Sequence, residues 1–183
     1  MHESVIRIQA ENNPYLAFED VPVTLTCNNK PVAEVGVPQT LECTGGSSAS
    51  ATLSGSATDA DSDPLTLAWT APGITFDDPT SATPTASFPL GTTTASLVAN
   101  DTYENSDPAT TTVTVLDTTP PSIVCPAPVI SDECQLNGTS TVVLPPATAS
   151  DVCQAVTISN SHNAGGANAS GTYPLGTTVV TFT

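Results

Sequence analysis

The stretch FPLGTTTASL, Phe88–Leu97, decides the fold, because it recurs as YPLGTTVVTF at Tyr173–Phe182. After the first copy, the chain continues into another Thr/Val-rich segment, Thr110–Leu116, whereas it stops at Thr183, directly after the second copy. We therefore expect one complete β-domain and one that lacks its last strand. A sheet without its last strand has an unpaired edge, and such edges tend to pair with other chains. The pattern favours assembly over catalysis.

Composition and charge exclude several classes of partner. The 183 residues provide room for about two small domains. Two Lys and Arg residues stand against 18 Asp and Glu residues, which gives a net charge of −16. This charge argues against nucleic acid as a partner and favours divalent cations or basic partners. No apolar run approaches the length of about 18 residues that a membrane-spanning helix needs, so we expect no membrane insertion.

Alternating apolar residues, interrupted at short intervals by Gly, Pro, Asn and Asp, predict an all-β chain of tandem immunoglobulin-like β-sandwiches. Trp69, the only tryptophan, is predicted to lie in the core of the first sandwich. The predicted strands of that sandwich are Pro31–Val35, Gln39–Cys43, Ser50–Ser56, Leu65–Trp69, Thr83–Phe88, Thr93–Ala99 and Thr110–Leu116.

The chain divides into three parts by the same reasoning. We expect a complete sandwich over 30–118 and an incomplete one over 119–183, joined by a stiff linker that contains Pro120 and Pro121. Residues 1–29 read as the last hairpin of a preceding or neighbouring domain. The residues predicted to take part in assembly are apolar strand positions at the two ends, namely Val5, Ile6, Ile8, Val21, Val23, Leu25, Val179, Val180 and Phe182.

The complementary ends allow two interpretations. In the first, the N-terminal hairpin inserts into the open domain of the next copy, which is β-strand complementation and propagates head to tail. In the second, these residues are an excerpt of a long covalent array, and the same polypeptide completes each domain. Both interpretations place sandwiches end to end.

Two stretches resemble known families. Leu53–Trp69, which contains LSGSATDADSD, together with the FPLGTT stretch that begins at Phe88, resembles a polycystic-kidney-disease-type (PKD-like) repeat. Asp117–Pro126 and Ala149–Cys153, together with the second copy of the repeated stretch, resemble a hyalin repeat (HYR). The resemblance implies immunoglobulin-like sandwiches of secreted and cell-surface proteins that act as adhesive modules, spacers or accessory domains. A hyalin repeat normally continues into a Cys-bearing last strand, which this sequence lacks.

A candidate calcium site lies in the acidic loop of the first sandwich. Asp59, Asp61 and Asp63 alternate between two predicted strands, and the Asn100-Asp101 turn is expected at the same pole. Ca²⁺ takes six to eight oxygen ligands in loose geometry, which suits such a loop. The resemblance to PKD-like modules, some of which bind calcium near this loop, points the same way. The alternative is a solvated turn whose Asp side chains bond their own backbone.

Five cysteines predict an oxidising compartment with one thiol left over. No CxxC spacing is present, which argues against zinc. We expect Cys125 to pair with Cys153, and Cys27 with Cys43, leaving Cys134. If a neighbour's hairpin completes the second domain, Cys27 would instead meet Cys134 in an interchain bridge. The sequence leaves the connectivity open.

The sequence offers little for catalysis. His2 is near the terminus and His162 lies in a Ser/Asn/Gly loop, and neither accompanies a nucleophile at a recognisable spacing. Asn100, Asn137 and Asn168 match the acceptor pattern for N-glycosylation.

These observations predict a non-catalytic extracellular or cell-surface protein that works as a structural or adhesive repeat and associates with itself head to tail. The alternative is a calcium-dependent module that binds a carbohydrate or protein ligand beside a secreted protein. Exposed and clustered Tyr15, Phe18 and Tyr103 would favour this alternative, because such sites usually present aromatic side chains.

Overall fold

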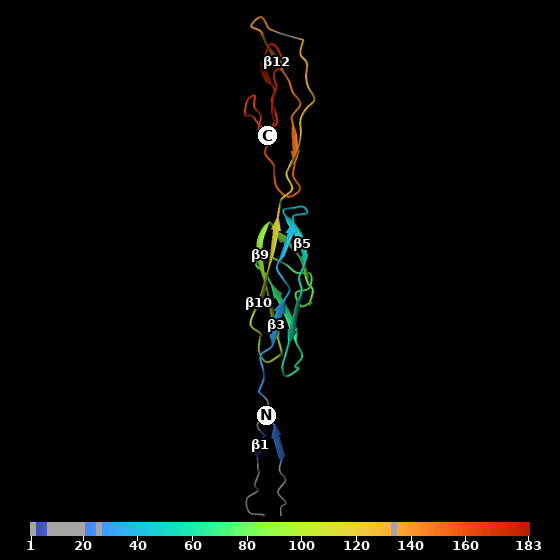
Figure 1. Ribbon diagram of the computed structural model, residues 1–183, viewed down its shortest axis with the longest axis vertical. Coiled ribbons are helices and arrows are strands. Elements are labelled where there is room, and N and C mark those ends of the chain that lie inside the picture. The colour runs from blue at the N-terminus through green and yellow to red at the C-terminus, as the bar shows by residue number, and fades with distance from the viewer. Residues whose placement is uncertain (1–2, 7–20, 25–26, 133–134) are drawn as a thin grey trace, which may run out of the picture.

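The computed structural model describes residues 3–6, 21–24, 27–132 and 135–183. Over these residues the chain is all-β, as the sequence predicts, with fourteen strands and no helix. Accordingly, none of the described segments forms a helix capable of spanning a bilayer. The chain comprises an N-terminal hairpin, an N-terminal sandwich that contains β3 to β10, and a C-terminal unit that contains β11 to β14 (Figure 1).

The strands are short, as is usual for a sandwich. Those of the hairpin and the N-terminal sandwich are β1 (Glu3–Ile6), β2 (Val21–Thr24), β3 (Val32–Val35), β4 (Gln39–Glu42), β5 (Ser48–Thr52), β6 (Gly55–Thr58), β7 (Thr66–Thr70), β8 (Thr85–Pro89), β9 (Gly91–Asn100) and β10 (Ala109–Leu116). Those of the C-terminal unit are β11 (Ser122–Val124), β12 (Thr139–Val142), β13 (Thr148–Ser150) and β14 (Gly171–Pro174).

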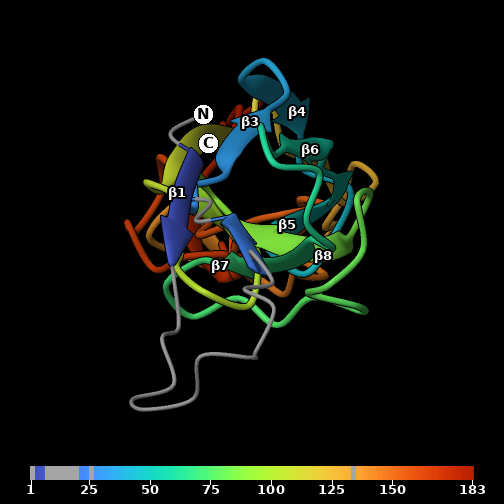
Figure 2. The ribbon, with the colours of Figure 1, turned by 90° about the horizontal axis from the view of Figure 1, so that it is seen from below.

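The N-terminal sandwich has one four-stranded sheet in the order β4-β10-β9-β7. The opposing layer consists of two antiparallel ladders, β3 with β6 and β5 with β8 (Figure 2). β9 and β10 form an antiparallel hairpin, whereas β4 runs parallel to β10. The parallel pairing places the end of β4 beside the end of β10, and the backbone N–H of Cys43 donates to the carbonyl of Leu116 at 2.7 Å.

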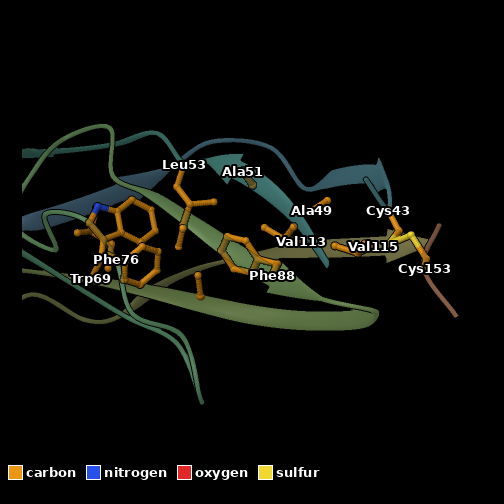
Figure 3. Packing of buried hydrophobic residues seen from close by; sticks show 13 residues of the cluster. Cys43, Ala49, Ala51, Leu53, Trp69, Phe76, Phe88, Val113, Val115 and Cys153 are labelled. Carbon is orange, nitrogen blue, oxygen red and sulfur yellow. A yellow bond between two sulfur atoms is a disulfide. The ribbon is translucent and has the colours of Figure 1, made fainter. Parts of the chain in front are cut away.

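The core of this sandwich follows from the period-2 alternation of each strand. Phe88 on β8, Leu97 on β9 and Val113 on β10 are fully buried. Trp69 lies in the core, as predicted, and its ring centroid is 6.3 Å from that of Phe76. Figure 3 shows Trp69, Phe76, Phe88 and Val113 in a row that ends at the disulfide between Cys43 and Cys153.

One predicted strand, Ser50–Ser56, is divided in the structure. β5 pairs with β8, but β6 pairs with β3, so the chain changes partner between them. Leu53 is buried at this corner. A Cβ atom added at Gly55 would lie only 2.5 Å from Cζ2 of Trp69, so a residue without a side chain is needed where the corner approaches the core.

The C-terminal unit pairs less of its backbone. β11 pairs with β13 and β12 pairs with β14, in two separate ladders. Asn160 and Phe182 form an isolated bridge, and Ser159 and Thr183 exchange two backbone hydrogen bonds at 2.8 and 3.0 Å. The repeated stretch 176–180 is not a strand here, although its counterpart forms the first half of β9.

The N-terminal hairpin consists of β1 and β2, which are antiparallel. Ser4 pairs with Val23, and Ile6 pairs with Val21. The expectation that both segments are strands is therefore correct for Glu3–Ile6 and Val21–Thr24. The predicted assembly residues Ile8 and Leu25 lie outside the described residues.

Candidate functional site

An open groove runs along the C-terminal unit. Its volume is about 580 Å³. One wall is formed by Val129, Ile130 and Ser131, and the other by the segment 174–178 together with Val180 and Phe182. Apolar side chains stand at the rims, because Ile130 is 89% exposed and Leu175 is 80% exposed. Exposed apolar side chains gathered along a groove are a common feature of interaction surfaces.

The walls of this groove correspond to the two strands that flank β10 in the N-terminal sandwich. The segment 176–183 repeats the sequence of β9, and its bridge from Phe182 to Asn160 repeats the pairing of Leu97 with Trp69. The other wall precedes Glu133-Cys134, as β4 ends at Glu42 before Cys43. In the N-terminal sandwich, β10 lies between β4 and β9. The groove therefore corresponds in position to β10 of the N-terminal sandwich.

The predicted assembly residues near the C-terminus divide between two faces. Val180 and Phe182 line the groove and are partly buried. Val179 points elsewhere and is 80% exposed. This alternation is that of a strand, and the counterparts of Val180 and Phe182 on β9, Ala95 and Leu97, are fully buried.

The acidic loop brings the predicted calcium ligands together. One carboxylate oxygen from each of Asp59, Asp61 and Asp63 lies within 4.8 Å of the others. The Oδ1 atom of Asp59 accepts from the backbone N–H of Asp61 at 2.8 Å. Its Oδ2 atom is buried and has no hydrogen-bond partner. A buried carboxylate oxygen without a donor is costly, and a cation would satisfy it.

The linker before β3 contributes to the same pole. Asn29 donates its backbone N–H to Oδ2 of Asp61 at 2.6 Å, and Asn28 donates its amide to Oδ2 of Asp101 at 2.9 Å. Asp101 is fully buried, and its Oδ1 atom accepts the backbone N–H of Glu104 at 2.7 Å. Asp101 is therefore already bonded by protein donors. The predicted ligand Asn100 also directs its side chain inward to the turn, where its amide donates to Asn105 Oδ1 at 2.9 Å.

The acidic loop carries opposing electrostatic effects. The pKa of Asp63 is raised, first by desolvation and then by the charges of Asp59, Asp61 and Asp101. The pKa of Asp101 is lowered, chiefly by the backbone hydrogen bond from Glu104. The ionised form of Asp63 is therefore disfavoured in the cluster, and a bound cation would offset the repulsion among its carboxylates.

The cysteine pairing differs from both expected bridges. Cys43 is bonded to Cys153, which lies 110 positions further along the chain (Figure 3). The predicted pairs Cys125–Cys153 and Cys27–Cys43 are therefore wrong, and Cys27 and Cys125 are free and exposed. The reason is the parallel pairing of β4 with β10, which carries Cys43 to the junction where Cys153 lies. Cys134 lies outside the described residues.

Polar contacts surround this disulfide at the junction of the two units. Glu42 accepts the backbone N–H of Thr118 at 2.7 Å, and this hydrogen bond is the main reason that the pKa of Glu42 is lowered. The hydroxyl of Ser47 donates to the carbonyl of Cys153 at 2.5 Å. The sequence analysis did not anticipate this pairing. Cys43 directly follows β4, and β4 pairs with β10, which leads into the linker.

The remaining predicted sites are dispersed. Asn137 and Asn168, two of the glycosylation candidates, are exposed, whereas Asn100 is partly buried. Tyr103 is 73% exposed. Tyr15 and Phe18, its proposed companions in an aromatic ligand site, lie outside the described residues.

Comparison with known proteins identifies no family. No family model matches the chain, and no curated protein matches it. Among solved structures, the chain is similar to the Yersinia pseudotuberculosis adhesin InvE, at 23% sequence identity and a TM-score of 0.28. The match covers 71% of this chain and spans 38% of the adhesin chain.

Proposed function

We propose that the protein is a non-catalytic extracellular structural protein, a repeat unit of a filament or surface stalk whose copies join head to tail by strand insertion. The observation that carries the proposal is the groove of the C-terminal unit, which has the position that β10 occupies in the N-terminal sandwich. The buried disulfide supports an extracellular location, because disulfides persist in oxidising compartments.

The strand that fits the groove is β2 of a second copy. In β1 and β2, Ser4 pairs with Val23, as Thr93 pairs with Val113 in β9 and β10. β2 therefore corresponds to β10. The inward residues of β10 are almost completely buried, and Val113 has no exposed surface. By this correspondence, Val21 and Val23 would take the inward positions of the inserted strand, and the alternation in the sequence continues to Leu25.

Insertion exchanges one partner of β2 for another. Within one chain, β2 pairs with β1. In the assembly it would pair with the segment 176–180 of the acceptor, so backbone hydrogen bonds are replaced rather than lost. The gain is the burial of apolar side chains, at about 1.5–3 kcal/mol for each Val or Leu. Such a contact joins two different surfaces and therefore propagates without closing.

Calcium has a supporting role in this proposal. The unpartnered Oδ2 atom of Asp59 and the close approach of Asp61 and Asp63 favour a cation at the acidic loop. The ion would neutralise the pole beside the linker at Asn28 and Asn29, which precedes β3. A bound Ca²⁺ would thereby fix the orientation of the N-terminal hairpin relative to the sandwich.

Mixing of two blocked variants tests the head-to-tail contact. Val23→Asp blocks the donor strand and Val180→Asp blocks the groove, so neither variant should extend a chain of copies in sedimentation velocity. Mixed at equal amounts, they should form a heterodimer, because each retains the half that the other lacks. Val179→Asp, which changes an exposed neighbour of Val180, is the matched control and should assemble normally.

The outcome distinguishes a groove filled by β2 of a second copy from a groove filled by the same polypeptide. If the chain with its native residues remains monomeric at every concentration, strand insertion between copies is wrong. The groove would then be filled by the same polypeptide in a covalent array. If both blocked variants still form long assemblies, the copies join through another surface, and the proposal fails as well.

A further inference from the structure

The disulfide Cys43–Cys153 joins two units that are otherwise connected by the linker 117–121. We propose that it is a load-bearing clasp, which transmits tension directly from the N-terminal sandwich to the C-terminal unit. With the clasp closed, residues 44–152 stay out of the path of the force. The mechanical effect of the clasp can be measured on a single chain, whether or not copies assemble. Its biological role as a load-bearing bond rests on the proposed structural function.

The path of tension through the N-terminal sandwich is short. Force applied from the N-terminal side enters the sandwich near Lys30, which forms an exposed ion pair with Asp107 just before the start of β10. It then passes along β3 and β4, which are consecutive strands that are already extended. β4 ends one residue before Cys43, at the junction with the C-terminal unit. Tension on the closed disulfide is therefore carried from one pole to the other by β3 and β4.

The segment enclosed by the disulfide contains most of the fold. β5 through β13 lie between the two cysteines in sequence, and only β3, β4 and β14 lie outside them between Asn28 and Thr183. An intact covalent bond between the ends of this segment prevents it from being pulled out. Tension therefore cannot extend the segment that carries the core residues of β8 to β10.

Opening the clasp changes the geometry of loading. Tension would then enter through β3 and β4 and leave through the end of β10 into the linker. β4 and β10 are parallel neighbours, with Val113 beside Gln39 and Leu116 beside Glu42. Force would act in shear along this ladder, and its rupture would release the whole sandwich. The closed disulfide removes residues 44–152 from the length of chain that tension can extend.

The surroundings of the disulfide support a permanent structural role. Cys43 and Cys153 are each only 5% exposed, so a reductant reaches them poorly, and access limits thiol–disulfide exchange. Asp151 fixes the loop before the bond by accepting the backbone N–H groups of Cys153 and Gln154, each at 2.8 Å. Gln154 in turn donates to Asp117 in the linker at 2.8 Å. The loop is therefore held against the linker directly after Cys153.

Single-molecule force spectroscopy on the full chain, with handles at both ends, tests the clasp. Reduction should add the length of the enclosed segment to the length released on unfolding. A separation of 110 residues, at about 3.3–3.6 Å per extended residue, gives roughly 360–400 Å. Cys43→Ser should release the same extra length without reductant. Cys125→Ser, which removes an exposed free thiol, should behave like the native chain.

Two further measurements check that the variant folds and that the expected cysteines are bonded. Fluorescence of Trp69 at zero force establishes that Cys43→Ser still folds, and reduction of the native chain gives the same comparison without a substitution. Mass spectrometry after alkylation identifies the bonded pair. An equal released length before and after reduction would overturn the clasp. A monomeric chain that shows the extra length would refute the proposed assembly while leaving the clasp intact.

Discussion

Replacement of Gly55 by alanine should destabilise the N-terminal sandwich, because the new methyl group has no space. The added Cβ atom would lie 2.5 Å from Cζ2 of Trp69 and 2.6 Å from Cδ2 of Leu97. Trp69 is 2% exposed and Leu97 is fully buried, so neither can move aside freely. Overpacking of this kind costs about 1–3 kcal/mol. The reduced entropy of the unfolded chain returns about 0.4–1 kcal/mol, which leaves a net loss of about 1–2 kcal/mol.

Gly36→Ala is the matched control. Its added Cβ atom would lie 3.2 Å from the hydroxyl oxygen of Ser54, an exposed side chain that can rotate, so the free energy of unfolding should stay within about 0.5 kcal/mol of the native value. Both variants are measured by chemical denaturation with fluorescence of Trp69, which is the only tryptophan and reports on this sandwich. In a unit of 60–100 residues, a loss of about 1–2 kcal/mol lowers the melting temperature by about 4–16 °C. Equal stability of Gly55→Ala and Gly36→Ala would refute the packing of the corner against the core.

Three further outcomes follow from the same structure. Calcium at 10 mM should raise the free energy of unfolding by about 1.4–2.7 kcal/mol for a dissociation constant of about 0.1–1 mM. Asp61→Asn should remove most of this stabilisation, whereas Asp132→Asn should remove none. An equal stabilisation of the native chain and both variants would exclude the acidic loop as the site. In EDTA, stability should rise as pH falls through the raised pKa of Asp63, because protonation removes the desolvation cost of this carboxylate and its repulsion by the neighbouring charges. Stability should then fall as pH decreases further through the lowered pKa of Asp101, whose ionised form is favoured by folding. Calcium should abolish the rise, and denaturation midpoints that fall steadily with pH in EDTA would contradict it. Phe88→Ala, at a fully buried position, should cost about 3–5 kcal/mol in the same denaturation assay, and a loss below 1 kcal/mol would show that the core is packed differently.

Most of the strands of the N-terminal sandwich could be predicted from sequence, because a half-buried strand alternates apolar and polar residues. Thr110–Leu116 is an example, since the predicted segment agrees with β10 to within one residue. The division of Ser50–Ser56 could not be predicted, because alternation continues through the corner and only the three-dimensional approach of Trp69 requires Gly55.

The candidate site was predicted less completely. Asp59, Asp61 and Asp63 are close in sequence, so their approach in space followed from one loop. The pairing of Cys43 with Cys153 depends on a parallel neighbour, β10, and on the linker geometry, neither of which is encoded locally. Long-range contacts of this kind leave no periodic signal in a single sequence.

The register of strand insertion offers the most direct test of the account. Thr114 on β10 pairs with Thr92 on β9, and their hydroxyl oxygens are 3.0 Å apart. The corresponding residues of the proposed contact are Thr24 of one copy and Thr177 of the next.

A chain that carries Thr24→Cys and Thr177→Cys, with Cys27, Cys125 and Cys134 replaced by serine, should therefore form a ladder of covalent oligomers on mild oxidation. A non-reducing gel measures this ladder. The same chain with the second cysteine at Val179 instead, two residues out of register, is the control and should cross-link far less. Monomer alone, or equal ladders in both chains, would contradict the insertion of β2 into the groove.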